Sequence, residues 1–140
     1  MADRFFVDTN VLVYAHDTGQ GVRHQPARAL VERLWEDRSG VLSTQVIQEL
    51  YVNLRRKAAR PVPADEARRL VEDYLCWPLV VNDGNSILGA LQLEQDHGIS
   101  FWDALILDAA NRSGARILYS EDLNHGQTYG ATTVVNPFAD

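Results

Sequence analysis

The sequence predicts one α/β domain, spanning residues 1–140, in which a short and mostly parallel β-sheet has helices on both faces. Two observations indicate this fold class. Short apolar runs rich in Val, Ile, Leu and Phe alternate with longer segments whose apolar residues recur every three or four positions. Strands joined by crossover helices produce that alternation, and they bury a parallel sheet on both sides. With 140 residues, 46% of them apolar, the chain can also build one sizeable core.

The composition narrows the classes of protein to which the chain can belong. A formal net charge of −6 argues against a general nucleic-acid coating protein, since such proteins are usually basic. No apolar stretch approaches the length of a membrane span, and the first residues lack the pattern of a signal peptide, so we expect no membrane association. The single Cys76 cannot form an internal disulfide. We therefore expect a cytoplasmic protein.

The first half of the chain is predicted to contain two strands and three helices. Residues 4–7 favour a strand, and after three polar residues an apolar run at 11–15 begins a short helix. A helix over residues 23–38 follows, and residues 41–42 form a very short strand. Ser43 or Thr44 then caps a helix that runs to about residue 59. The expected buried face of this helix consists of Val46, Ile47, Leu50, Tyr51 and Leu54.

The second half of the chain continues the alternation. Pro61 and Pro63 interrupt the chain, and a helix begins at Asp65. The remaining elements are predicted as a buried strand over residues 79–81, a helix over 82–97, a helix over 101–112, and strands over 116–119 and 132–135. Gly98 ends the first of these helices and Ser100 precedes the second. The apolar positions of the helix over 82–97 are Ile87, Leu88, Leu91 and Leu93.

Two acids follow strands at the point where each strand ends. Asp8 comes directly after the first strand, and Asp122 comes shortly after the strand over 116–119. Because the carboxyl ends of parallel strands meet at one edge of a sheet, these side chains are expected to lie close together if the strands are neighbours. Each also has a purely structural interpretation, since Asp8 can cap the next helix and Asp122 lies in a run of turn-forming residues. Glu121 is an alternative to Asp122.

Two further acids lie on predicted helices. Asp103 belongs to a helix that is apolar around nearly its whole circumference, where an unpaired carboxylate is costly. It also fits a capping box with Ser100, and a capped acid can still present an oxygen to a metal. Glu49 borders the apolar row of its helix, although most helical glutamates are simply solvated. Asp108 can pair with Arg112 one turn later, so we interpret it as structural.

One interpretation accounts for four of these acids: Asp8, Glu49, Asp103 and Asp122 converge on one or two divalent cations. Carboxylate oxygen is the ligand that Mg²⁺ and Mn²⁺ prefer. The sequence has no Cys and His pattern with zinc spacing, no glycine-rich phosphate loop and no Gly-x-Ser-x-Gly nucleophile motif.

The acidic segments resemble a known family over essentially the full length of the chain. They are similar to the motifs of PIN-domain ribonucleases, and most closely to those of VapC-type toxins from bacterial toxin–antitoxin pairs. The segments that carry this resemblance are Phe6-Val7-Asp8-Thr9-Asn10, the helix with Glu49, Phe101-Trp102-Asp103-Ala104, Tyr119-Ser120-Glu121-Asp122-Leu123 and Val134-Val135-Asn136-Pro137-Phe138. The resemblance implies a PIN-like domain that cleaves RNA with Mg²⁺, forms a homodimer and is inhibited by a cognate antitoxin.

The resemblance also implies roles for individual residues. Asp8, Asp103 and Asp122 would coordinate the metal, with Mn²⁺ a possible substitute for Mg²⁺, and Glu49 would complete its shell or accept a proton from water. The polar residues Thr9, Asn10 and Ser120 would hold these ligands in place. Apart from the resemblance, the basic residues at the end of the Glu49 helix could hold the RNA backbone; they are Arg55, Arg56, Lys57 and Arg60. A solvated helix end, favoured by the helix dipole, is an equally good interpretation of these four basic residues.

Two other functions remain open at this point. An aspartate-nucleophile phosphatase needs a second aspartate two residues after the nucleophile, and that position holds Asn10. A non-catalytic domain that binds RNA or a protein is the other alternative, against which the presence of all four acids argues. One cleavage assay on labelled RNA, with Mg²⁺ or with EDTA, separates the three functions.

Overall fold

The computed structural model describes residues 3–139, and these residues form a six-stranded sheet surrounded by helices. The strands are β1 (Phe5–Val7), β2 (Gly40–Ser43), β3 (Leu79–Val80), β4 (Ile117–Tyr119), β5 (Thr128–Tyr129) and β6 (Thr132–Val135). The helices are α1 (Thr9–His16), α2 (His24–Asp37), α3 (Thr44–Arg56), α4 (Ala64–Tyr74), α5 (Gly84–His97) and α6 (Phe101–Arg112), with a 3₁₀ turn η1 at Gly21–Arg23. The predicted α/β fold class is confirmed.

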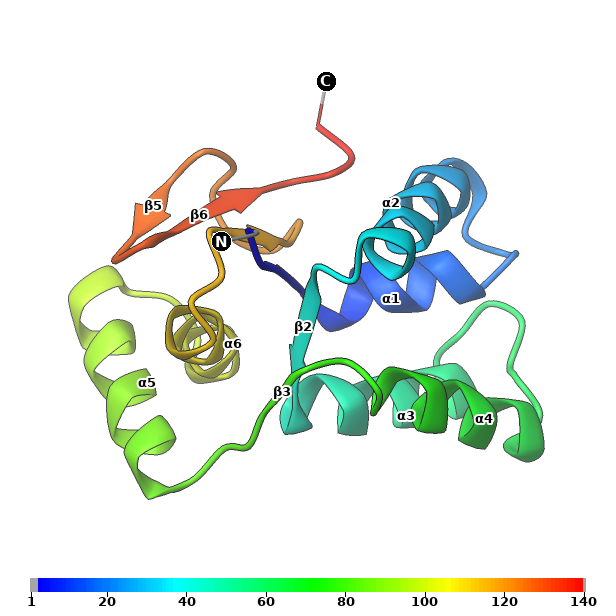
Figure 1. The fold of residues 1–140 in the computed structure, drawn as a ribbon, viewed down its shortest axis with the longest axis horizontal. Helices are drawn as coiled ribbons and strands as arrows, with labels where there is room; N and C mark the ends of the chain where they lie inside the picture. Colours follow the sequence, from blue (N-terminus) through cyan, green and yellow to red (C-terminus); the bar gives the residue numbers. More distant parts are fainter. Residues whose placement is uncertain (1–2, 140) are drawn as a thin grey trace.

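The sheet has the order β3-β2-β1-β4-β6-β5 and is parallel except at β5, which pairs antiparallel with β6. β1 lies in the interior of the sheet, where Phe6 pairs with Val41 of β2 and with Leu118 of β4. Figure 1 shows α1 and α2 on one side of β1 and β2, and α5 and α6 on the other. The side chains of Phe6, Leu118 and Val134 are fully buried between these layers. β1 and β4 are therefore adjacent, as the convergence of Asp8 and Asp122 requires.

Several helices begin at the capping residues that the sequence indicates. Asp8 accepts a hydrogen bond from the amide of Thr9 at the start of α1, and Ser43 accepts one from the amide of Val46 at the start of α3. The Ser100 hydroxyl accepts from the amide of Asp103 at 3.1 Å. These caps satisfy amide groups that the first helical turn leaves unpaired. By fixing where α1, α3 and α6 begin, the caps also help to position Asp8, Glu49 and Asp103.

Some details of the sequence interpretation were wrong. Tyr51, expected in the buried face of α3, is 41% exposed, and Val81, expected in a buried strand, is 66% exposed and lies beyond β3. α3 ends at Arg56 instead of residue 59, and α4 begins at Ala64 after Pro63. The short strand β5 was not predicted. Apolar spacing identifies a helix face that avoids water, but it does not show whether this chain covers all of that face.

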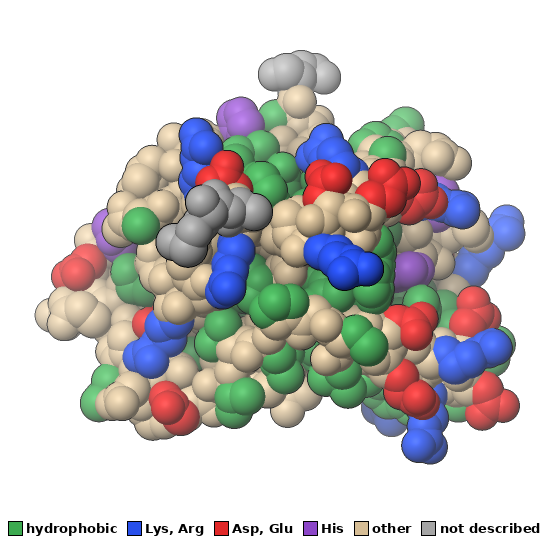
Figure 2. Space-filling model, viewed as in Figure 1, with side chains coloured by type: hydrophobic (Ala, Val, Ile, Leu, Met, Phe, Trp, Pro, Cys, Tyr) green, Lys and Arg blue, Asp and Glu red, His purple; other side chains and the backbone are tan. Residues whose placement is uncertain are grey.

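The surface mixes charges of both signs. In the view of Figure 2, Lys and Arg side chains intermix with Asp and Glu over the part of the molecule where α2 and α4 lie. The pairs Arg28–Glu32 on α2 and Arg68–Glu72 on α4 contribute to this pattern. Within residues 3–139, no helix has both the length and the apolar character needed to cross a bilayer.

Candidate active site

The four acids singled out in the sequence lie around one small pocket at the carboxyl ends of β1 and β4. Its volume is about 100 Å³. Its walls are formed by Asp8, Thr9, Asn10, Gln45, Glu49, Asn53, Trp102, Asp103, Ile106 and Asp122. The acids come from four different parts of the chain: the end of β1, the middle of α3, the first turn of α6 and the loop after β4. The fold thus brings together carboxylates that are far apart in sequence.

Asp8 is the most enclosed of the four acids. Its Oδ1 accepts a hydrogen bond of 2.7 Å from the Thr9 amide, and its Oδ2 accepts one of 2.9 Å from the Ser120 hydroxyl. Burial raises the pKa of Asp8 to about 7, with the charges of Asp122 and Asp103 adding to the effect and the two hydrogen bonds opposing it. Asp8 therefore caps α1 and supplies a carboxylate to the pocket at the same time.

The structure separates the two adjacent acids after β4. Asp122 lines the pocket, where its Oδ2 accepts a hydrogen bond of 3.3 Å from Nδ2 of Asn10. Burial, followed by the charge of Asp103, raises the pKa of Asp122. Glu121 is engaged elsewhere: Tyr14 donates a hydrogen bond to its Oε1, and Arg23 Nε lies 2.9 Å from its Oε2. The alternative that Glu121 replaces Asp122 at this pocket is thus not supported by the geometry.

Glu49 and Asp103 reach the pocket from two different helices, α3 and α6. The Thr9 hydroxyl donates a hydrogen bond of 2.8 Å to Oε1 of Glu49, which orients this carboxylate. Asp103 lies in the first turn of α6, where Ser100 caps its amide. Among the hydrogen bonds of the described residues, none returns from the Asp103 carboxylate to Ser100, so the expected capping box is only half formed. The carboxylate of Asp103 thus remains available to the pocket.

The chemistry of the pocket fits a hard divalent cation. Its polar lining offers carboxylate, hydroxyl and amide groups, and it contains neither Cys nor His. Burial, with a smaller contribution from the neighbouring acids, raises the pKa values of Asp8 and Asp122, so a cation in the pocket would favour their ionised forms. Within residues 3–139, however, no three His, Cys, Asp or Glu side chains are already close enough to form a ready coordination shell. Closely spaced carboxylates repel one another, which is consistent with this separation.

Some pocket residues were not found from the sequence. Gln45 and Asn53 line the pocket together with Glu49, and the three are spaced four residues apart on α3. That spacing places side chains on one helix face and could have identified them. Trp102 and Ile106, which are four residues apart on α6, line the pocket together with Asp103. These two provide the apolar part of the wall.

The four basic residues expected to contact RNA do not line the pocket. They are exposed at and beyond the end of α3, two or more residues after Asn53. Arg55 donates a hydrogen bond of 3.2 Å to the carbonyl of Val62, and the amide of Arg60 donates to Asp17. Asp108 forms the predicted pair with Arg112 at 2.7 Å. It also packs under Gly89 of α5, where a Cβ atom would lie 2.2 Å from its Oδ1.

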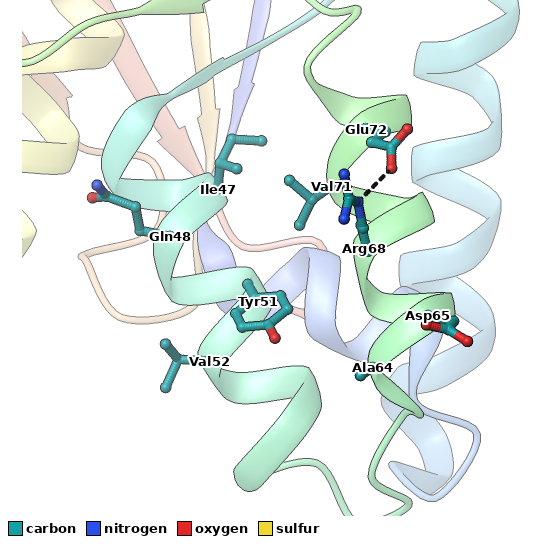
Figure 3. A pocket seen from close by; sticks show the side chains of 9 residues that line it. All are labelled: Ile47, Gln48, Tyr51, Val52, Ala64, Asp65, Arg68, Val71 and Glu72. Atoms are coloured by element: carbon teal, nitrogen blue, oxygen red, sulfur yellow. Dashed lines mark hydrogen bonds and ion pairs between the residues drawn. The ribbon is translucent and has the colours of Figure 1, made fainter.

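A larger hollow lies on a different face of α3. The groove between α3 and α4 has a volume of about 700 Å³ and is lined largely by apolar groups, with Arg68 and Glu72 paired at its wall (Figure 3). Size alone does not identify an active site. We place the site in the smaller pocket because the buried and interacting carboxylates lie there.

Comparison with known proteins relates the chain to one family. The family model described as PIN domain matches residues 5–131. No curated protein matches the chain significantly.

Solved structures share the fold at low sequence identity. VapC20 from Mycobacterium tuberculosis, described as a toxin that cleaves the sarcin–ricin loop, has 22% identity and a TM-score of 0.66 over 84% of this chain and 89% of its own. A toxin–antitoxin complex from Klebsiella pneumoniae has 18% sequence identity and a TM-score of 0.70. The match covers 97% of this chain and 98% of the other. DNA-bound VapBC from Salmonella typhimurium has 15% sequence identity and a TM-score of 0.64. The match covers 95% of this chain and 97% of the other. These similarities establish a common fold.

Proposed function

The chain belongs to the PIN domain family, and from this premise we propose that it is a Mg²⁺-dependent endoribonuclease that acts as the toxin of a bacterial toxin–antitoxin pair. The observation that carries the proposal is the convergence of Asp8, Glu49, Asp103 and Asp122 on one pocket. The toxins with the same fold support it, since one of them is described as cleaving the sarcin–ricin loop. RNA is the proposed substrate, and the phosphodiester bond is the proposed site of hydrolysis.

Three of the acids are proposed to hold the cation. These are Asp8, Asp103 and Asp122, which line the pocket and offer oxygen ligands. When bound, Mg²⁺ or Mn²⁺ lowers the pKa of water and offsets the negative charge that develops on the phosphate. Ser120 and Asn10 fix the orientation of Asp8 and Asp122 through their hydrogen bonds.

Glu49 is the proposed proton acceptor. Its carboxylate lies at the pocket wall, and the hydrogen bond from Thr9 directs one oxygen while the other stays available. A carboxylate in this position can take a proton from the attacking water or complete the cation's shell. Trp102 and Ile106 supply the apolar part of the pocket lining.

RNA binding and partners complete the proposal. We propose that four basic residues contact the RNA backbone beside the pocket, since they are exposed at and beyond the end of the helix that carries Glu49; they are Arg55, Arg56, Lys57 and Arg60. We further propose a cytoplasmic homodimer that is inhibited by a cognate antitoxin. The structures of related toxins with antitoxins from Klebsiella pneumoniae and Salmonella typhimurium support the antitoxin part of this proposal.

A cleavage assay tests the proposed function. End-labelled RNA is incubated with the wild-type chain in Mg²⁺, in Mn²⁺ or in excess EDTA, alongside Asp103→Asn and the control Asp96→Asn, which changes an exposed acid of α5. Cleavage is expected with either metal and absent in EDTA, and Asp103→Asn is expected to lower the rate roughly 100-fold or more. Cleavage that persists in EDTA contradicts the metal assignment. An Asp103→Asn variant that cuts at the wild-type rate removes Asp103 from the mechanism.

A further inference from the structure

Gln45 is a buried amide in the wall of the acidic pocket. It lies on α3 one turn before Glu49, and its side chain is only 6% exposed. Its Nε2 donates a hydrogen bond of 3.3 Å to the carbonyl of Trp102. Its Oε1 is closed off from solvent and has no donor among residues 3–139. Because buried polar atoms in folded proteins are almost always paired, this oxygen requires an explanation.

The orientation of the Gln45 amide follows from its neighbour. If nitrogen and oxygen were exchanged, Oε1 would face the Trp102 carbonyl, and two acceptors would meet without a proton between them. The Trp102 carbonyl thus takes the amide nitrogen and leaves the oxygen without a partner. The terminal torsion of glutamine is soft, and turning the oxygen toward the pocket gives up only the long bond of 3.3 Å from Nε2 to the Trp102 carbonyl.

The position of Gln45 also links two of the pocket acids. Trp102 directly precedes Asp103, so the bond from Gln45 joins the helix that carries Glu49 to the helix that carries Asp103. Around Gln45 the pocket is rich in acceptors, since its lining includes four carboxylates. None of the described residues donates to Oε1, so a ligand that enters the pocket can supply the donor.

We propose that Gln45 is a positioning residue of the pocket, and that its Oε1 accepts a hydrogen bond from a hydroxyl donor that enters with the ligand. This inference rests on the proposed function. The donor is either a water molecule in the shell of the divalent cation or a ribose hydroxyl of the RNA. Both offer the same O–H chemistry, and the experiment below distinguishes them.

If Gln45 positions a ligand, its replacement should weaken interactions with the ligand without lowering the stability of the metal-free protein. Gln45→Met keeps the length of the side chain but removes both amide atoms. The Trp102 carbonyl loses only a long bond, because the helical bond from Ile106 still reaches it. Since the variant also removes an unpaired buried acceptor, its metal-free form should unfold at the same urea concentration as the wild type or a higher one. A purely structural glutamine would give a lower midpoint.

Gln48→Met is the matched control. Gln48 lies three residues further along α3, is exposed, and is one of the residues that line the α3–α4 groove instead of the acidic pocket (Figure 3). The two variants thus make the same chemical change on two faces of one helix. Urea unfolding is measured in EDTA, and Mn²⁺ binding is measured by calorimetry without RNA, under conditions in which all three proteins are folded.

Binding identifies the donor. If it is water in the cation's shell, Gln45→Met should bind Mn²⁺ roughly tenfold more weakly than the wild type, and Gln48→Met should not. If it is a ribose hydroxyl, Mn²⁺ affinity is unchanged, but a 2′-deoxy nucleotide at the cleaved position should slow Gln45→Met less than it slows the wild type. Either result, with the unfolding midpoint retained, supports the inference.

Two results would overturn the inference. One is a Gln45→Met variant with wild-type Mn²⁺ affinity and a wild-type response to the deoxy substitution. The other is weaker binding together with a lowered unfolding midpoint, which indicates a structural role. Neither result affects the proposed function as long as the wild-type chain cleaves RNA in Mg²⁺. A wild-type chain that neither binds Mn²⁺ nor cleaves RNA fails the proposed function itself.

Discussion

The hydroxyl of Ser120 lies 2.9 Å from Oδ2 of Asp8 and donates a hydrogen bond to it, although 112 positions separate the two residues in the chain. The same hydroxyl accepts a bond of 3.1 Å from the amide of Asp122. The parallel pairing of β1 with β4 makes this contact possible, because both strands end at the same edge of the sheet. One serine therefore connects two of the pocket acids.

Removing the Ser120 hydroxyl should shift the pH dependence of cleavage. The bond from Ser120 lowers the pKa of Asp8, so its loss in Ser120→Ala should move that pKa above about 7. Since ionised Asp8 is the proposed metal ligand, the acidic limb of the pH–rate profile should move to higher pH. Ser39→Ala is the control, because the Ser39 hydroxyl is buried at the end of α2 without a partner among residues 3–139. Superimposable profiles for wild type and Ser120→Ala would contradict the proposed link.

The metal-free protein should lose stability as the pH rises toward neutrality. The folded-state pKa of Asp8 is about 7, above its ordinary value of 3.8, so its contribution to stability is present below 3.8 and is lost as the pH rises through 7. Asp8→Asn lacks this titration. Relative to that variant, the wild type in EDTA should lose on the order of 4 kcal/mol of unfolding free energy between pH 4 and pH 7, as an upper bound.

Urea unfolding of both proteins at several pH values checks this expectation. Adding Mg²⁺ should restore the stability of the wild type near pH 7 and have little effect on Asp8→Asn, because a cation binds the ionised carboxylate. Parallel pH curves for the two proteins in EDTA would show that Asp8 titrates normally.

Adjacent acids after β4 should respond very differently to the same change. Asp122→Asn removes a charge from the pocket and should lower the cleavage rate by at least roughly tenfold. Glu121→Gln weakens the partly exposed pair with Arg23, so it should cost up to about 1 kcal/mol of stability and leave the rate within about twofold. Cleavage rates and urea unfolding midpoints of both variants and the wild type test this difference. A large loss of rate in Glu121→Gln would return Glu121 to the site.

Asp17 should be important for stability but not for chemistry. Its buried carboxylate accepts hydrogen bonds from the amides of Gly19, Ala59 and Arg60 and from the side chain of Gln20. Burial acts to raise the pKa of Asp17, but these four bonds outweigh it and hold that pKa below its usual value. Asp17→Ala leaves the donors unpaired and should cost on the order of 3 kcal/mol at pH 7.

The lowered pKa of Asp17 gives this prediction a pH dependence. The stabilisation is present above the ordinary value of 3.8 and is lost as the pH falls through the folded-state value, so the two proteins should converge in acid. Asp37→Ala, which changes an exposed acid at the end of α2, is the control and should be nearly neutral. An Asp17→Ala variant as stable as the wild type at pH 7 would contradict the assignment.

The sequence predicts much of this fold because its local patterns are consistent with its tertiary structure. The strand before Asp8, the cap at Ser43 and the apolar helix around Asp103 each have a local cause that the structure retains. No local pattern in the sequence shows whether Glu121 or Asp122 enters the pocket. Glu121 turns away from the pocket because of Tyr14 and Arg23, which are about a hundred positions earlier in the chain.

Burial was harder to predict than helix position. Tyr51 continues the apolar row of α3, yet it lines an open groove, because α4 does not close over that part of the row. Ile87, Leu88 and Leu91 are similarly exposed on α5. Spacing shows which side chains share a helix face, whereas exposure depends on how closely the next helix packs. Gln45 was missed for the same reason, since its importance depends on the distant carbonyl of Trp102.

The wide sequence separation of the pocket acids has a consequence for biosynthesis. A growing polypeptide cannot assemble the pocket until the segment that carries Asp122 has emerged from the ribosome and β4 has joined β1. On the proposed function, a chain that stops before β4 should therefore not cleave RNA, because it lacks Asp122 and the strand that positions it.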